Sequence, residues 1–281
     1  MSSILIKYFK DNELELSLSY PGINLRRIQQ EWDYFKKCRG GQINQFLQLL
    51  KSGIPLEYIN QNAYFYKSEF FVDQRVLIPR SETEILVEMA VDAIKKNNKK
   101  ELKVCEVGVG SGAISLSIAK EIREKKLIFT CTDISEKALE VFKINQFLLN
   151  YGIAPQHEFY PVIDDRIKKV EDLFDFIFSN PPYIMQKEDF ELVHKQVIKY
   201  EPSIALFLED KSYFDWFADF FVMVKERLSL GGVFIMEGHE KHLDFLSEII
   251  EKQGWGSPKI IEDLCKNKRF LRIKKEKENH G

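Results

Sequence analysis

Apolar residues recur at two different spacings along the chain, and the spacing changes near the end of the first fifth of the sequence. Between residues 25 and 50 they repeat every three or four positions, which predicts two helices separated by a glycine pair. Leu14, Leu16 and Leu18 instead alternate as residues of a strand do, over a segment too short to assign. The pattern predicts a small helical N-terminal domain over residues 1–57.

A short aromatic-rich segment connects this domain to the rest of the chain. The run from Tyr58 to Val72 has the composition of a β-hairpin, and residues 58–75 are predicted to be a linker. An amphipathic helix follows it. Ser81 and Glu84 have the spacing of a capping box, so we expect the loop before this helix to be fixed to its first turn.

From residue 76 onward, short apolar runs alternate with amphipathic stretches, which is the pattern of strands and helices in turn. It predicts an α/β domain over residues 76–281 with a parallel sheet. The predicted strands are 102–107, 127–132, 175–179 and 233–237, with further strand in 260–275, and the predicted helices include 114–122, 136–149, 213–228 and a segment ending near 253.

The composition is that of an ordinary globular protein, with 44% hydrophobic and 30% charged residues among 281. A formal net charge of −2 provides no field that attracts nucleic acid, so direct nucleic-acid binding is not expected. The chain shows no signal-peptide pattern, and no apolar run approaches the roughly 20 residues of a membrane span. Cys105 and Cys131 lie in apolar runs, as buried thiols do. We therefore expect a cytoplasmic protein with no membrane partner.

The strand predicted at 102–107 continues directly into Gly108-Val109-Gly110-Ser111-Gly112. Glycines at a strand-to-helix turn let a ligand approach the backbone, and the helix presents its N-terminal amides to that ligand. The next strand ends in Asp133, about twenty residues past the last glycine, where an acid would meet a ribose diol. These residues fit a dinucleotide and S-adenosylmethionine equally well.

The strand predicted at 175–179 stops in Asn180-Pro181-Pro182-Tyr183. Two prolines fix φ at about −65° and remove two backbone donors, so the strand cannot continue. The Asn180 side chain and the Pro181 carbonyl remain side by side as acceptors, next to an aromatic residue and no charge. This set suits a planar NH₂ group, either a carboxamide or the exocyclic amine of adenine.

Two features favour methyl transfer over hydride transfer. Glu106 lies two positions before the first glycine, which is more similar to a methyltransferase loop than to the dinucleotide fingerprint. A hydride-transfer enzyme also has no use for Asn-Pro-Pro-Tyr. Because ligands bind at the carboxyl ends of strands in open parallel sheets, the glycine loop and this motif should share one crevice. A methyl donor and an NH₂ acceptor would then be adjacent.

Several segments, in the same order along residues 53–275, resemble the peptide chain release factor N(5)-glutamine methyltransferases. Asn-Pro-Pro-Tyr alone also fits adenine amino-methyltransferases, whereas the IPRSETE stretch is similar to the release factor family's own signature. The chain departs from the family at 207–209, where Phe-Leu-Glu replaces a frequent glycine pair. The segments are Gly53-x-Pro55, Tyr58-Ile59, VLIPRSETE at 76–84, EVGVGSGAISLSIA at 106–119, Asp133, SNPPYI at 179–184, YEP at 200–202 and GGVFIMEG at 231–238.

The resemblance implies a Rossmann-like class I S-adenosylmethionine-dependent methyltransferase domain with a seven-stranded mixed sheet, preceded by a helical substrate-docking domain and a β-hairpin linker. It implies S-adenosyl-L-methionine as cofactor, S-adenosyl-L-homocysteine as product and peptide chain release factors as protein substrates. The implied reaction is methylation of the side-chain amide nitrogen of the glutamine in their Gly-Gly-Gln motif.

Three groups of site residues follow from the motifs and the resemblance together. The catalytic group is Asn180, Pro181 and Tyr183. The cofactor-binding group is Glu106, Gly108, Val109, Gly110, Ser111, Gly112, Asp133, Asn180 and either Asp164 or Asp165, of which Asp164 is preferred. The substrate-binding group is Arg80, Asn180, Pro181, Pro182 and Tyr183.

No metal is required by this chemistry, and His239 and His242 are expected to be surface residues. Trp216 is expected to be a core or interface aromatic. Two alternative hypotheses remain on the same fold. One is an adenine amino-methyltransferase acting on DNA or RNA, and the other is a binding module that has kept the donor pocket and lost the chemistry.

Overall fold

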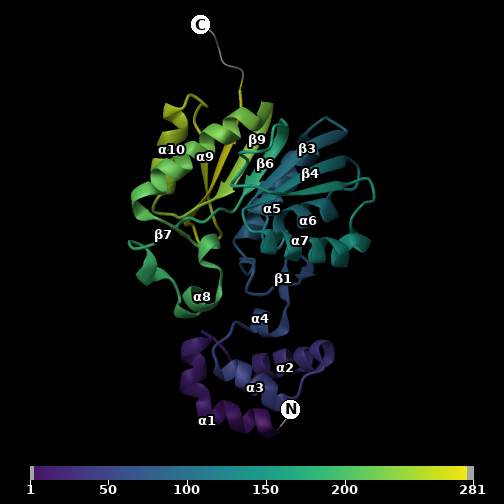
Figure 1. Ribbon diagram of the computed structural model, residues 1–281, viewed down its shortest axis with the longest axis vertical. Coiled ribbons are helices and arrows are strands. Elements are labelled where there is room, and N and C mark those ends of the chain that lie inside the picture. The colour runs from purple at the N-terminus through teal and green to yellow at the C-terminus, as the bar shows by residue number, and fades with distance from the viewer. Residues whose placement is uncertain (1–2, 277–281) are drawn as a thin grey trace.

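The N-terminal end of the computed structural model, which describes residues 3–276, is a group of helices set below the rest of the molecule (Figure 1). Their apolar faces enclose a small core of their own, which includes Ile28 and Phe46. The alternation of Leu14, Leu16 and Leu18 does not form a strand, because the segment is helical and only Leu16 is buried. The helices are α1 Ser3–Ser19, α2 Leu25–Arg39, α3 Ile43–Lys51 and α4 Leu56–Asn60.

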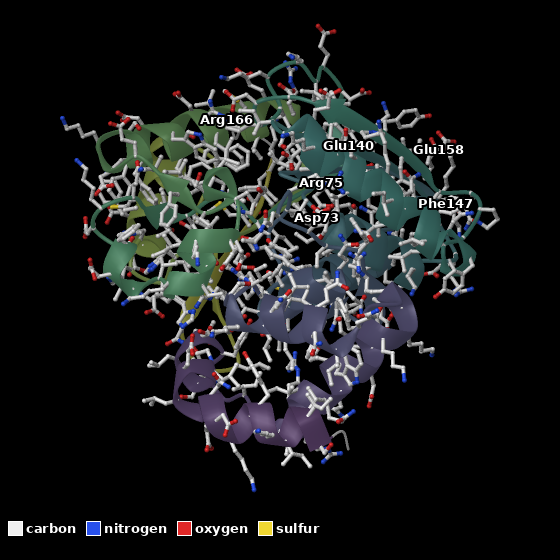
Figure 2. All side chains as sticks on the ribbon, turned by 60° about the horizontal axis from the view of Figure 1, so that its bottom comes forward. Asp73, Arg75, Glu140, Phe147, Glu158 and Arg166 are labelled. Carbon is white, nitrogen blue, oxygen red and sulfur yellow. The ribbon has the colours of Figure 1, made fainter. Side chains whose placement is uncertain are left out.

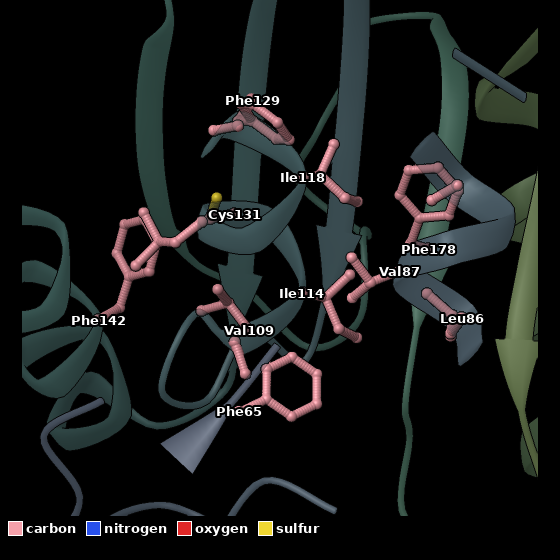
Figure 3. Packing of buried hydrophobic residues seen from close by; sticks show 14 of the residues in the cluster. Phe65, Leu86, Val87, Val109, Ile114, Ile118, Phe129, Cys131, Phe142 and Phe178 are labelled. Atoms are coloured by element: carbon pink, nitrogen blue, oxygen red, sulfur yellow. The ribbon is translucent and has the colours of Figure 1, made fainter. Parts of the chain in front are cut away.

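A β-hairpin follows these helices, with strands β1 Ala63–Phe65 and β2 Ser68–Phe70. Its turn residues, Tyr66 and Lys67, have φ angles of 43° and 64°. The predicted hairpin is confirmed over residues 63–70, whereas Tyr58 belongs to α4. Phe65 packs into the main core beside Val109 of the glycine loop (Figure 3). The hairpin is therefore packed against the glycine loop.

Helix α5, Thr83–Lys96, begins without the predicted capping box. The Ser81 hydroxyl donates to the Glu82 carboxylate, and no side chain caps the helix. The Glu84 carboxylate instead accepts a hydrogen bond from the backbone N–H of Tyr66 at 3.1 Å. The prediction of the capping box is wrong because a tertiary contact with the hairpin has taken the Glu84 side chain.

One large sheet, seven-stranded within the described residues, forms the centre of the larger part of the molecule, in the order β10-β11-β9-β6-β3-β4-β5. The strands from β9 to β5 are parallel, and β11 and β10 join antiparallel at one edge, so the predicted mixed sheet is confirmed. The strands are β3 Glu101–Val107, β4 Lys126–Asp133, β5 Glu158–Ile163, β6 Phe174–Ser179, β9 Leu228–Glu237, β10 Lys259–Glu262 and β11 Lys268–Lys274.

Helices cover both faces of this sheet. Successive strand residues point to opposite faces, so Phe176 and Phe178 belong to the core cluster that includes residues of α5, α6 and α7, while Ile177 belongs to the cluster that includes α9 and α10. Figure 3 shows Phe178 beside Val87 of α5. Both faces of the central strands are apolar, as parallel sheets require. The helices are α6 Ala113–Glu121, α7 Glu136–Leu149, α9 Tyr213–Arg227 and α10 Leu243–Lys252.

A long connection between β6 and α9 reaches back toward the N-terminal helices. It contains α8 Lys195–Tyr200. The Gln196 side chain donates to the Gly53 carbonyl at 2.8 Å, and the Tyr200 hydroxyl donates to the Ser52 carbonyl. Two of the residues at which the chain departs from the family pattern form strand β8 Phe207–Leu208, which pairs with β7 Ile184–Met185. Short 3-10 turns lie at Asn150–Gly152, Phe190–Leu192, Ser203–Ala205 and Asp210–Ser212.

Two further expectations bear on the environment of the protein. Cys105 and Cys131 are fully buried, as their apolar surroundings in the sequence predict. Among residues 3–276, no helix combines the length and the apolar character needed to cross a bilayer.

Candidate active site

A cavity of about 240 Å³ opens at the carboxyl ends of β3, β4 and β6. This is the edge at which open parallel sheets bind ligands. The glycine loop after β3, the acids after β4 and β5 and the Asn-Pro-Pro motif after β6 all line it. The sheet thus brings together segments that lie up to about 75 positions apart in the sequence, as the spacing of the motifs predicts.

The glycine loop adopts a conformation that only glycine accepts readily. Gly108, Gly110 and Gly112 have φ angles of 75°, 52° and 80°. A Cβ atom at Gly108 or Gly110 would meet nothing within 4 Å, so the protein leaves space in front of these two glycines. Gly112 differs, because it does not line the cavity and a Cβ there would lie 2.5 Å from the Phe142 ring. Gly112 therefore serves helix packing.

Two carboxylates fix the geometry of this loop. Glu106 is buried under it and accepts from the Ser115 N–H at 2.8 Å, and burial raises the pKa of Glu106 to about 8. Asp133 accepts from the N–H groups of Gly110 and Ser135, each at 2.9 Å. Burial raises the pKa of Asp133, and its backbone hydrogen bonds oppose that rise. Asp133 is consequently held in one orientation at the cavity wall.

The loop after β5 contributes a carboxylate with unused hydrogen-bonding capacity. Asp164 is buried, and its Oδ2 accepts from the Lys169 N–H at 2.8 Å, while its Oδ1 has no partner among the described residues. Asp165 is instead ion-paired with Arg166 and Lys168. A buried acceptor without a partner in a cavity wall fits an amino group of a ligand. Of the two candidates in the sequence, Asp164 is the one that meets this condition.

Two features of the cavity rim were missed in the sequence. The Arg166 guanidinium lies 5.0 Å from the centre of the Trp216 ring, and both residues line the cavity. Trp216 is therefore a site aromatic, and the expectation of a core or interface role is incomplete. On another side, Arg75 lines the cavity and pairs with Asp73 at 2.7 Å and Glu140 at 2.8 Å (Figure 2).

A second cavity, also of about 240 Å³, adjoins the first. Asn180 and Pro181 line both cavities, and Tyr183 lines only the second. The remaining residues common to both are Leu77, Arg80 and Ala205. Asn180 and Pro181 thus lie at the boundary between the two cavities.

Hydrogen bonds between distant side chains hold the boundary residues. The Asn180 amide nitrogen donates to the Thr83 hydroxyl at 3.1 Å, and Thr83 donates to Glu237 at 2.6 Å. The Tyr183 hydroxyl donates to the other Glu237 oxygen at 3.0 Å. Burial raises the pKa of Glu237, and the hydrogen bonds from Thr83 and Tyr183 and the charge of Arg269 oppose the rise.

Arg80 is held by a carboxylate from the YEP segment. Its guanidinium pairs with Glu201 at 2.8 Å, and the second Glu201 oxygen accepts from the Ile78 N–H at 3.1 Å. Glu201 is buried and so anchors the loop that carries Arg80. The structure places Arg80 in the lining of both cavities.

The expectation that His239 and His242 are surface residues is wrong for His242, which is buried, and only partly right for the half-buried His239. His242 Nε2 lies 3.0 Å from the buried Asp189 carboxylate, which also accepts from Lys241 and from the Met185 N–H. The three residues Asp189, His239 and His242 lie close enough to share a metal ion. Because Asp189 already accepts from three donors, we interpret the group as a hydrogen-bonded anchor for the loop.

The structure brings most of the predicted site residues to the two cavities and leaves Gly112 outside both linings. Sequence reasoning missed Thr83, Glu237, Ile134, Trp216 and His239 as residues of the site or its support. Thr83 and Glu237 lie inside two of the segments that carry the family resemblance, IPRSETE and GGVFIMEG. Those segments gave a signal that could have identified them.

A glycine loop and a carboxylate at the ends of adjacent strands form a nucleotide-binding type of crevice, and the similarities that follow identify an S-adenosylmethionine-dependent methyltransferase. A family model described as "Methyltransferase small domain" matches residues 81–204. The release factor glutamine methyltransferase of Clostridium acetobutylicum is 36% identical over 230 residues, covering 82% of this chain and 78% of that protein. That of Flavobacterium psychrophilum is 32% identical over 275 residues, covering 96% and 89%. The chain belongs to the release factor glutamine methyltransferase family.

Solved structures share the fold at low sequence identity. A methyltransferase from Pyrococcus furiosus has a TM-score of 0.51 and 19% identity, covering 74% of this chain and 89% of that one. A Thermus thermophilus 16S rRNA methyltransferase, solved with AdoMet and guanosine, has a TM-score of 0.52 and 14% identity, covering 76% and 50%. At these identities the likeness is evidence for the fold alone.

Proposed function

We propose that this protein methylates the side-chain amide nitrogen of the glutamine in the Gly-Gly-Gln motif of peptide chain release factors. The observation that carries the proposal is the position of Asn180 and Pro181 at the boundary of two adjoining cavities. One cavity has the lining of a nucleoside site, and the other is available to an acceptor side chain. The names of the relatives support release factors as the substrate class.

The cofactor cavity fits S-adenosylmethionine through its polar groups. The glycine loop provides space beside its backbone, Asp133 is oriented to meet a ribose diol, and Asp164 Oδ1 is a buried acceptor without a partner that can meet the amino group of adenine. Glu106, Val109 and Ser111 line the same cavity, and the Glu106 carboxylate can face an ammonium group. When bound, the cofactor supplies a methyl group on a positively charged sulfur.

The protein's own task is to present the acceptor nitrogen. The nitrogen of a neutral amide is a poor nucleophile because its lone pair is delocalised into the carbonyl. Asn180 Oδ1 and the Pro181 carbonyl can accept the two N–H hydrogens of a glutamine side chain, which holds the nitrogen at the boundary and stabilises positive charge as it develops there. Well-oriented reactants gain on the order of 7 to 11 kcal/mol from such positioning.

Neither acceptor takes a proton, so these two groups orient the amide and do not deprotonate it. The proton becomes acidic only as the new bond to nitrogen forms, so no general base is required before transfer. As the sulfur–methyl bond breaks to leave neutral S-adenosyl-L-homocysteine, the methylated amide loses that proton to solvent. Tyr183 walls the acceptor cavity, with its ring fixed by the hydrogen bond to Glu237 and by the Tyr213 hydroxyl, which donates to the Tyr183 carbonyl at 3.0 Å. An aromatic wall favours a planar amide, and its face attracts a nearby cation.

The test is mass spectrometry of a purified release factor after incubation with the protein and S-adenosylmethionine. We expect the peptide containing Gly-Gly-Gln to gain one methylene group, and a release factor with glutamate in place of that glutamine to gain nothing. Asn180→Ala should lose the gain while still binding the cofactor by calorimetry. Asn98→Ala, at an exposed loop position, is the matched control and should retain it.

Methylation of adenine in a DNA or RNA duplex with no gain on the release factor would overturn the proposal in favour of the nucleic-acid alternative. Binding of the cofactor without transfer to either substrate would point to the non-catalytic binding module. Cofactor binding by the wild type, measured by calorimetry, separates both outcomes from a misfolded preparation, which would bind no cofactor.

A further inference from the structure

The orientation of the Asn180 amide is the feature on which the acceptor site depends, and the geometry assigns its control to two residues outside the motif. A carboxamide has a donor end and an acceptor end of nearly the same shape, so rotation by half a turn exchanges them. If the NH₂ end faced the acceptor cavity, two donors would meet and the substrate amide would be repelled. Some contact on the protein side must select one orientation.

That contact is the Thr83 hydroxyl. Thr83 is buried, and its oxygen lies 3.1 Å from the Asn180 amide nitrogen and 2.6 Å from Glu237 Oε2. A hydroxyl has one hydrogen, and each Glu237 oxygen accepts from one hydroxyl, Oε2 from Thr83 and Oε1 from Tyr183. The Thr83 hydrogen is therefore committed to Glu237, and toward Asn180 Thr83 can only accept. The opposite orientation of Asn180 would place two oxygen atoms against each other with no hydrogen between them.

Glu237 holds the other residue of the motif as well. Its Oε1 accepts from the Tyr183 hydroxyl at 3.0 Å, and its side chain is 1% exposed. The sheet register explains the convergence, because Ser179 pairs with Met236 and so Asn180 and Glu237 leave neighbouring strands side by side. Arg269, next to the Glu237 partner Phe270 on β11, supplies a positive charge. Glu237 thus orients Asn180 through Thr83 and holds Tyr183 directly.

We propose that Thr83 and Glu237 are positioning residues for methyl transfer, which fix the Asn180 side chain with its oxygen toward the acceptor amide. The inference rests on the proposed role of Asn180 as an acceptor for an NH₂ group, and it deepens that role. Neither residue needs to touch the substrate, so their removal should lower the turnover of bound substrates and leave cofactor binding intact.

The first test compares Thr83→Val, which keeps the shape and removes the hydroxyl, with Thr83→Ser, which keeps the hydroxyl. We expect Thr83→Val to lower kcat on a release factor by about 10- to 100-fold, with the cofactor Kd within about twofold. Thr83→Ser should restore kcat to within about threefold of the wild-type value. The matched control is Thr130→Val on β4, which should leave kcat unchanged.

A double-mutant comparison separates positioning from general structural support. In an Asn180→Ala background Thr83 has nothing to orient, so we expect Thr83→Val to cause less than about a twofold further loss of kcat. Glu237→Gln presents an NH₂ group to either Thr83 or Tyr183 and should also lower kcat in the wild-type background. Equal losses in both backgrounds, equal losses in Thr83→Val and Thr83→Ser, or a loss confined to the cofactor Kd would each overturn the proposal.

A measurement that needs no activity distinguishes failure of this inference from failure of the proposed function. In protein labelled with nitrogen-15 at asparagine, the Asn180 NH₂ resonances should show one hydrogen slowed in exchange by its bond to Thr83. That protection should disappear in Thr83→Val and persist in Thr83→Ser. If the wild type does not methylate a release factor and the protection is present, the proposed substrate is wrong and the positioning network stands. If the protection is absent in the wild type, the network itself is refuted.

Discussion

The two cavities of the active site are built in different ways. The cavity proposed for the cofactor contains the glycine loop, and the carboxylates Glu106 and Asp133 accept from backbone N–H groups 9 and 23 positions away in the sequence. The cavity proposed for the acceptor is lined by Asn180 and Tyr183, which are held by hydrogen bonds to Thr83 and Glu237. Thr83 and Glu237 bond to each other across 154 positions in the sequence. We therefore expect substitutions in the first region to affect stability and cofactor affinity, and substitutions in the second to affect turnover.

The largest effect that would sharpen this comparison is expected at Gly112. A Cβ atom there would lie 2.5 Å from the fully buried Phe142, at a φ of 80° that other residues rarely adopt. Overpacking and backbone strain together should lower the free energy of unfolding of Gly112→Ala by about 3 kcal/mol, measured by urea denaturation. Gly110→Ala, which has open space, should lose only about 1 kcal/mol. Equal decreases in the free energy of unfolding of the two variants would show that Gly112 is required by the backbone conformation of the loop and not by its packing against Phe142.

A second effect is expected in the pH dependence of stability, because burial raises the pKa of Glu106 to about 8. Between its usual value and about 8, folded Glu106 keeps a proton that the unfolded chain has released, so the free energy of unfolding falls as pH rises through this window. Glu106→Gln carries no such proton. Between pH 5 and pH 9 the free energy of unfolding of the wild type should fall by about 2 kcal/mol more than that of the Glu106→Gln variant. The full rise in the pKa of Glu106 would correspond to about 5 kcal/mol, which is the upper limit for this difference.

Chemical denaturation of both proteins at several pH values would measure that difference. Parallel curves would mean that Glu106 is ionised in the folded protein, and the cofactor cavity would then contain more water around this residue than its burial indicates. Addition of S-adenosylmethionine should reduce the difference, since an ammonium group near Glu106 favours the charged carboxylate.

The smallest effect, and the one most able to break the comparison, is expected at Asp133. Asn has one carbonyl oxygen and cannot accept from both Gly110 and Ser135, so the loop loses one of its two ties. We expect Asp133→Asn to raise the cofactor Kd by about tenfold, equivalent to about 1.4 kcal/mol, and to leave kcat at saturating cofactor within about twofold. Calorimetry and steady-state kinetics would measure the two. A fall in kcat with unchanged Kd would remove the distinction between the two cavities.

Much of the fold could be predicted because its signals are local. The alternation of apolar runs and helical patterns predicts β3, β4, β6 and β9, and the structure places these strands in one mixed sheet. Predictions failed where a tertiary contact outweighed a local preference. Glu84 bonds to the hairpin and not to the start of its own helix, and His242 is buried against Asp189. No sequence spacing reveals either partner.

The candidate site divides in the same way. The sequence by itself determined the glycine loop, Asp133 and the Asn-Pro-Pro-Tyr turn, because φ preferences, missing backbone donors and strand ends are properties of neighbouring residues. Only the tertiary structure decided that Thr83 and Glu237 lie beside Asn180, and that Asp164 and not Asp165 has an oxygen without a partner. Those outcomes depend on strand register and on packing between segments far apart in the chain, which a local pattern does not specify.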